Sequence, residues 1–192
     1  MKQKEKTKST IGYQVRKIIL SQFAALFVID AVWLVAFAWT MESPIWSLIA
    51  SIAFCLVYFV MLYSPSGEIA DHDKKPYTRL SPNKMKGFMF GAMISVTNVI
   101  FCLLYMFIWN NFSDGSSLNS IGALIANICF MLWTSPYFGF MNPSAGSITW
   151  YSIIIMIVLP IAATGLGYFA VCKNFYFEDK FASFVYVKKD KK

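Results

Sequence analysis

Charged residues are scarce in this chain of 192 residues and missing from long stretches of it. Asp, Glu, Lys and Arg make up only 14% of the sequence. The stretch from Gly115 to Cys172 contains none of these residues and no His. Apolar residues make up 57%, whereas ordinary soluble domains contain about 45–50%. This composition excludes an ordinary soluble domain and indicates an integral membrane protein.

Motifs of common catalytic and cofactor chemistry are missing as well. The sequence has no GxxxxGK phosphate loop, no GxSxG, no HExxH and no Gly-rich dinucleotide turn. Its cysteines all lie in or beside apolar runs, outside any CxxC or Cys/His spacing (Cys55, Cys102, Cys129 and Cys172). We therefore predict no catalytic residue, no metal site and no cofactor, and we interpret the cysteines as small apolar packing residues.

Positive charge is concentrated in three blocks. All 17 Lys and Arg residues fall within 2–17, 74–86 and 173–192, and the formal net charge is +7. Because the blocks flank apolar segments, they fit the positive-inside rule and not a basic surface that binds nucleic acid. We predict a multi-pass protein of the cell (plasma) membrane whose N- and C-termini are cytoplasmic. Its predicted partner is the lipid bilayer, and we predict that it does not bind nucleic acid.

Four apolar segments are long enough to cross a bilayer, since a helix needs about 20 residues for a hydrocarbon core of about 30 Å. They are 18–39, 45–63, 88–109 and 150–172. The first follows a basic stretch and contains Ala36-Phe37-Ala38, as a secretory signal does. Its apolar core exceeds the roughly 7–15 residues of such signals, so we interpret it as a membrane span.

The uncharged region holds more apolar sequence than its one predicted span requires. An apolar piece at 118–133 precedes a break rich in Pro and Gly at 135–147. If 118–133 also crossed, the basic block 173–192 would lie opposite the other two blocks, against the positive-inside rule. We predict an all-α fold of four transmembrane helices in two hairpins plus a re-entrant or interfacial segment, with five spans as the alternative. The irregular backbone must then be buried against protein or line a wet cavity.

These segments divide the chain into five parts. A polar loop with three prolines and mixed charge separates the two halves. The parts are a basic cytoplasmic N-terminus (1–17), a helical hairpin (18–63), a basic cytoplasmic loop (64–87), spans three and four with the embedded segment 118–147 (88–172), and a basic cytoplasmic tail (173–192).

Asp30 is the only charged residue inside the predicted spans. An ionised carboxylate at the centre of a membrane helix costs at least about 2.5–3.5 kcal/mol, so such a residue is protonated, paired or turned toward a polar interior. Two interpretations stay open: a proton, cation or partner-contact site, or a neutral carboxyl bonded to a neighbouring helix. With the amides that could bond to it, the candidate intramembrane polar site is Asp30, Asn98 and Asn127.

Small residues recur every four positions in the apolar segments. Such stripes let helix backbones approach closely, either within the chain or between subunits. They are Ser47, Ser51 and Cys55; Gly87, Gly91 and Ser95; Gly122 and Ala126; and Ala163 and Gly167. The predicted helix-packing residues are Gly87, Gly91, Ser95, Ala163 and Gly167.

The only histidine lies between two acidic residues, in Asp71-His72-Asp73. These are residue types that ligate metals or tune an imidazole. No second His or Cys is spaced to complete a site, so we interpret the triplet as solvated charge in the loop.

Small size, missing catalytic motifs and many small-residue stripes favour a non-catalytic membrane subunit. It would assemble with itself or with partner membrane proteins, for example in a transport or export complex. The alternative is a small transporter or channel that uses Asp30 in a polar cavity.

Overall fold

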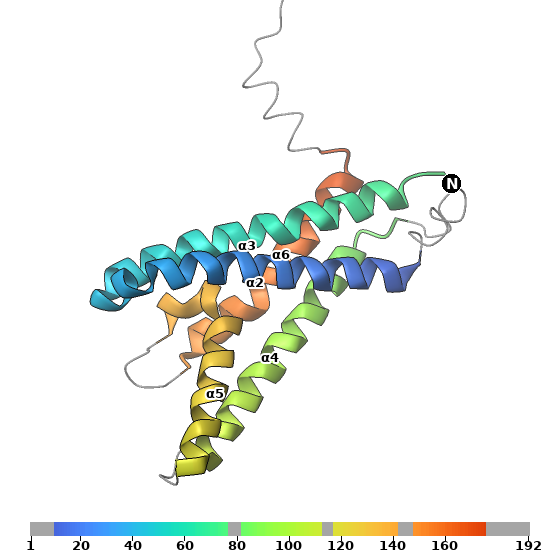
Figure 1. Cartoon of the computed structure of the whole chain (residues 1–192). Coiled ribbons are helices and arrows are strands. Elements are labelled where there is room, and N and C mark those ends of the chain that lie inside the picture. The colour runs from blue at the N-terminus through green and yellow to red at the C-terminus, as the bar shows by residue number, and fades with distance from the viewer. Residues whose placement is uncertain (1–9, 77–81, 113–116, 142–147, 176–192) are drawn as a thin grey trace, which may run out of the picture.

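The computed structural model of the chain describes residues 10–76, 82–112, 117–141 and 148–175 (Figure 1). The basic ends 1–9 and 176–192, and 142–147 of the embedded segment, lie outside the described residues. The described part folds into five α-helices and one 3-10 helix. They are α2 (Ile11–Glu42), α3 (Pro44–Asp73), α4 (Lys86–Phe112), α5 (Ser117–Trp133), η1 (Ser135–Phe140) and α6 (Trp150–Cys172).

Four of these helices, α2, α3, α4 and α6, are long and apolar enough to cross a membrane. α5 has 17 residues, and its apolar part at Leu124–Trp133 is shorter than a crossing requires. The predicted fold class, four long apolar helices plus one shorter apolar segment in an all-helical membrane protein, is confirmed.

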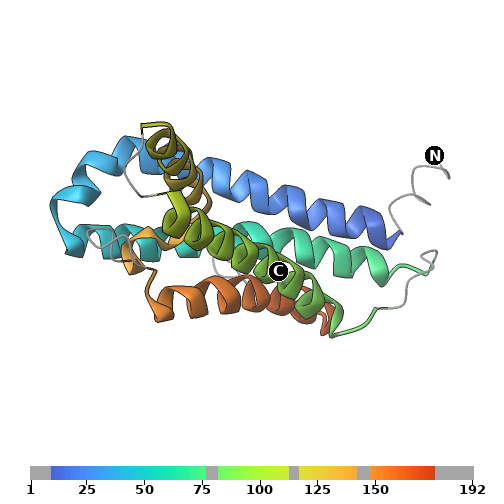
Figure 2. The ribbon, with the colours of Figure 1, turned by 90° about the horizontal axis from the view of Figure 1, so that it is seen from below.

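The helices form two antiparallel hairpins joined through α6. α2 and α3 run side by side and are separated by one extended residue, Ser43, after which Pro44 begins α3 at a position where its missing N–H costs nothing (Figure 1). α4 and α5 form the second hairpin, which diverges from the first toward the bottom of Figure 1. α6 packs against both α3 and α4, as the turned view in Figure 2 shows.

One predicted boundary is wrong: the first part of the loop 64–87 is helical, because α3 continues through Asp73. Pro65 lies inside this helix and does not end it. In membrane helices neighbouring groups can take over the backbone bonding that a proline disturbs. Here Ser66 anchors the segment to α6, since its hydroxyl donates to the carbonyl oxygen of Thr164 at 2.6 Å.

Small residues bring α6 close to its neighbours. A Cβ at Gly87 would collide with Tyr168, a Cβ at Gly91 with the α6 backbone at Ile161, and a Cβ at Gly167 with the α3 backbone. In the same α4–α6 contact the hydroxyl of Ser95 donates to the carbonyl oxygen of Ile157 at 2.7 Å. Ala163 is fully buried. Close packing of this kind is how helices associate in lipid.

The break after α5 is taken up by η1, whose first four residues are buried. Side chains of α3 satisfy its backbone: Gly139 N donates to the hydroxyl of Ser51 at 2.5 Å, and the Cys55 thiol donates to the carbonyl oxygen of Pro136 at 3.2 Å. A Cβ at Gly139 would collide with the backbone of Ser47. This irregular segment is therefore held against protein, as a non-helical backbone at membrane depth requires.

Candidate functional site

Asn98 forms the centre of a buried polar cluster between four helices. Its side-chain oxygen accepts from the Gln22 side chain of α2 at 3.4 Å and from the Trp133 indole of α5 at 3.1 Å. Its amide nitrogen donates to the carbonyl oxygen of Met156 in α6 at 3.0 Å. Asn98 and Gln22 are both 3% exposed, so these bonds form away from water, where an unmade bond would be costly. We call Asn98, Gln22 and Trp133 the Asn98 cluster.

Asp30 lies elsewhere, where α2 meets η1. Its carboxyl is next to the buried Ser135 hydroxyl. One carboxyl oxygen of Asp30 and the neighbouring Ser135 hydroxyl are buried without a hydrogen bond of good geometry among the described residues. The Tyr137 ring turns instead toward Tyr58 of α3, at a ring-centroid distance of 6.0 Å. Trp33, one turn further along α2, packs edge-on against Phe138 at a ring-centroid distance of 5.4 Å. The contact between α2 and the start of η1 is therefore one place in the described bundle where buried polar atoms remain without hydrogen bonds.

Asn127 belongs to the α4–α5 hairpin. Its side-chain oxygen accepts from the Tyr105 hydroxyl at 3.3 Å. The three predicted site residues thus occupy three places: Asp30 faces η1, Asn98 joins four helices and Asn127 links α5 to α4. No hydrogen bond found among the described residues joins any two of them.

A second buried cluster, which the sequence did not predict, surrounds Asp73 at the end of α3. Its carboxylate accepts from Gln14 of α2 at 2.6 Å, from Lys86 of α4 at 2.6 Å and from the hydroxyl of Tyr168 of α6 at 2.8 Å. The Asp73 side chain is 0% exposed and that of Lys86 is 13% exposed. One carboxylate therefore ties together the four long helices, and we call these residues the Asp73 cluster.

Residues of all three basic blocks meet at this end of the bundle. Lys17 of the first block pairs with Glu68. Lys74 of the second donates to the carbonyl oxygen of Val171 and, at 2.6 Å, to the side chain of Asn174, which follows the first lysine of the third block. The described residues of the three basic blocks thus lie at one end of the structure.

The interpretation of Asp71-His72-Asp73 as solvated charge is wrong for Asp73. Because α3 remains helical, Ser66, Ala70 and Asp73 share one face, and all three are buried. Asp71 points elsewhere and forms an exposed pair with Lys75 at 3.7 Å. Among the described residues, no group of three or more His, Cys, Asp and Glu side chains is placed to hold a metal ion. The signal that could have found Asp73 is the helical spacing of Ser66, Ala70 and Asp73.

Comparison of the chain with protein-family models, with curated proteins and with solved structures finds no match. The arguments about function therefore rest on the geometry of the chain itself.

Proposed function

We propose that this multi-pass helical membrane protein is a small non-catalytic subunit that assembles with itself or with partner membrane proteins, and that α5 provides the contact. A transport or export complex remains the predicted setting.

Among the described residues, one small-residue stripe faces open space at Gly122, and this observation carries the proposal. A Cβ at Gly122 would meet no atom within 4 Å, in contrast to Gly87, Gly91 and Gly167. Gly122 shares a helical face with Ala126 and Cys129, and Cys129 is exposed. Large apolar side chains beside the stripe are also exposed, among them Ile121 at 56% and Ile125 at 56%. A glycine and an alanine four residues apart allow close contact with a second helix.

Cys129 provides a direct test of this contact. In native membranes, mild oxidation is expected to cross-link Cys129 to a second copy or to a partner chain, because facing stripes bring such positions within the about 4.4–6.8 Å that a disulfide spans between Cα atoms. Cys129→Ser should remove the product, which is read on a non-reducing gel. Cys102→Ser is the matched control, since Cys102 is buried and should not contribute.

Gly122→Leu should reduce the cross-linked fraction roughly tenfold, because a large side chain keeps the second helix away. The fold itself should be unaffected, since Gly122 faces open space. Gly12→Leu is the matched control: Gly12 also has no atom within 4 Å of a Cβ, but it lies at the start of α2. Equal cross-linking in wild type and Gly122→Leu would count against α5 as the contact.

The proposal also includes a cell-membrane location with both termini in the cytoplasm. Its support is that described residues of the three basic blocks lie at one end of the bundle. Short segments flanking membrane spans follow the positive-inside rule well.

The second candidate function is a small transporter or channel that uses Asp30. It is favoured by the buried polar atoms of Asp30 and Ser135 that form no hydrogen bond among the described residues, since such groups often mark a place for water, an ion or a proton.

Asp30→Asn separates the two candidates. If Asp30 carries a proton or cation, the variant should lose at least about 90% of an ion-coupled flux in reconstituted vesicles, because an amide cannot take up and release a proton. Cross-linking through Cys129 should persist. Asn127→Ala is a suitable control because its bond to Tyr105 stays within the α4–α5 hairpin. Unchanged flux in Asp30→Asn would end the transporter candidate.

A further inference from the structure

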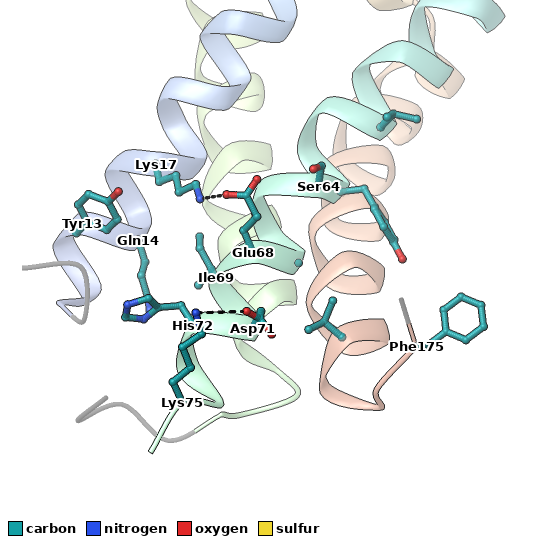
Figure 3. A pocket seen from close by; sticks show the side chains of 14 residues that line it. Tyr13, Gln14, Lys17, Ser64, Glu68, Ile69, Asp71, His72, Lys75 and Phe175 are labelled. Carbon is teal, nitrogen blue, oxygen red and sulfur yellow. Dashed lines mark hydrogen bonds and ion pairs between the residues drawn. The ribbon is translucent and has the colours of Figure 1, made fainter. Parts of the chain in front are cut away.

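A cavity of about 600 Å³ lies at the end of the bundle that holds the Asp73 cluster (Figure 3). Its walls come from the start of α2, the second half of α3 and the end of α6, together with Lys75 and Phe175 just beyond these two helices. Sites for small molecules span about 300–1,000 Å³, so the size suits a head group or a small ligand. No described residue of α5 lines it, so the cavity is separate from the α5 contact proposed above.

The lining changes from apolar to charged along α3. Val60, at the apolar end, is 61% exposed and lies in the part of α3 that is long and apolar enough to span a membrane. Glu68 and Asp71, at the other end, carry charge. Val60 and Asp71 are roughly 16 Å apart along the helix at 1.5 Å per residue. A phospholipid presents the same order of groups, with acyl chains below a charged head.

The charges of the cavity cancel. Lys17 pairs with Glu68 across the α2–α3 interface, and Lys75 lies 3.7 Å from Asp71 on α3, as the dashed lines in Figure 3 show. Each pair remains accessible, because the side chain of Glu68 is 63% exposed and those of Asp71 and Lys75 are 47% and 44% exposed. A ligand can therefore meet two ammonium groups and two carboxylates at the same mouth.

We propose that this cavity binds a phospholipid with a zwitterionic head group. The lysines Lys17 and Lys75 attract the phosphate, and the carboxylates of Glu68 and Asp71 attract the ammonium group. The acyl chains follow the apolar side of α3 past Val60. An anionic head group is disfavoured, because it would bring a phosphate to the two lysines but no ammonium group to the two carboxylates.

The test measures which lipids stay with the full-length protein. The protein is extracted from nanodiscs that contain equal amounts of phosphatidylethanolamine and phosphatidylglycerol, and the co-purifying lipid is quantified by mass spectrometry. We expect an about fivefold excess of phosphatidylethanolamine over phosphatidylglycerol. A difference of this size is what ion pairs between partly exposed groups contribute to binding. Equal retention, an excess of phosphatidylglycerol, or no retained lipid would overturn the proposal. Free phosphoethanolamine should not displace the lipid, because the proposed site also holds acyl chains.

Two variants connect the preference to the cavity. Glu68→Lys makes the lining net positive and should reverse the preference toward phosphatidylglycerol. The double variant Lys17→Glu/Glu68→Lys restores the ion pair with its two charges exchanged. It should retain phosphatidylethanolamine within about twofold of wild type. Lys173→Gln is the matched control, since Lys173 lies at the same end but outside the cavity lining. Thermal unfolding shows that each variant is folded, and an unreversed preference in folded Glu68→Lys would contradict the site.

Discussion

Asp73→Ala is expected to lower the free energy of unfolding by about 3–5 kcal/mol, because removing one member of a buried ion pair leaves the other uncompensated. In the variant Lys86, whose side chain is 13% exposed, keeps a charge that it can neither pair nor hydrate well. Gln14 and Tyr168 lose their acceptor at the same time. Reversible unfolding of the purified protein in detergent measures the change.

Asp71→Ala is the matched control for this prediction. It removes the same side chain two residues away, but Asp71 forms only an exposed pair with Lys75, which contributes about 0–1 kcal/mol. A loss of similar size in both variants would mean that the position in α3, and not the buried contacts, causes the effect.

The double variant Asp73→Ala/Lys86→Met distinguishes an unpaired charge from lost packing. If the cost of Asp73→Ala comes mainly from the charge of Lys86, removing that charge should recover a large part of the stability. If the cost comes from the lost bonds to Gln14 and Tyr168, the double variant should be no more stable than Asp73→Ala alone.

The four long apolar helices and the shorter apolar segment could be predicted because they depend on local properties. Span length, hydropathy and the three basic blocks are each read from consecutive residues, and they led to four crossings and a short embedded segment. The break at 135–139 was recognised because Pro and Gly interrupt an apolar run, and the structure places η1 there. What the sequence did not indicate is that Ser51 and Cys55 of α3 bond to that break.

The polar clusters depend on how distant segments are aligned, and a single sequence does not show this. Asn98 was identified as a possible partner of Asp30, yet its bonds go to Gln22, Trp133 and Met156. Asp73 was missed because Ser64-Pro65-Ser66-Gly67 is typical of a turn, and a turn would have left the following charges in water. The fold continues the helix through Pro65 and thereby carries Asp73 into the bundle.

The small residues and the polar clusters act together. Close contact of α4 and α6 through Gly87 and Gly91 places Lys86 and Tyr168 beside the carboxylate of Asp73. A looser contact would move a lysine and a hydroxyl away from a buried charge. The close α4–α6 packing is therefore required for the bonds of Lys86 and Tyr168 to the Asp73 carboxylate.

Gly91→Ala tests that condition and is expected to lower the free energy of unfolding by about 1–3 kcal/mol through overpacking. A Cβ at this position would lie 2.7 Å from the carbonyl oxygen of Pro160 and still closer to the backbone at Ile161, so no side-chain rotation can relieve the contact. α6 must move away, and this also stretches the bond of 2.9 Å from the Thr164 hydroxyl to the carbonyl oxygen of Gly87.

Gly12→Ala provides the contrast, since a Cβ at Gly12 meets no described atom within 4 Å and alanine favours a helix over glycine. The two substitutions should therefore change the free energy of unfolding in opposite directions, although each adds only one methyl group.

If α4 and α6 separate in Gly91→Ala, the bonds of Lys86 and Tyr168 to Asp73 weaken with them. Asp73→Ala should then cost less in the Gly91→Ala background than in wild type. Equal costs in both backgrounds would show that the helix contact and the Asp73 cluster are independent.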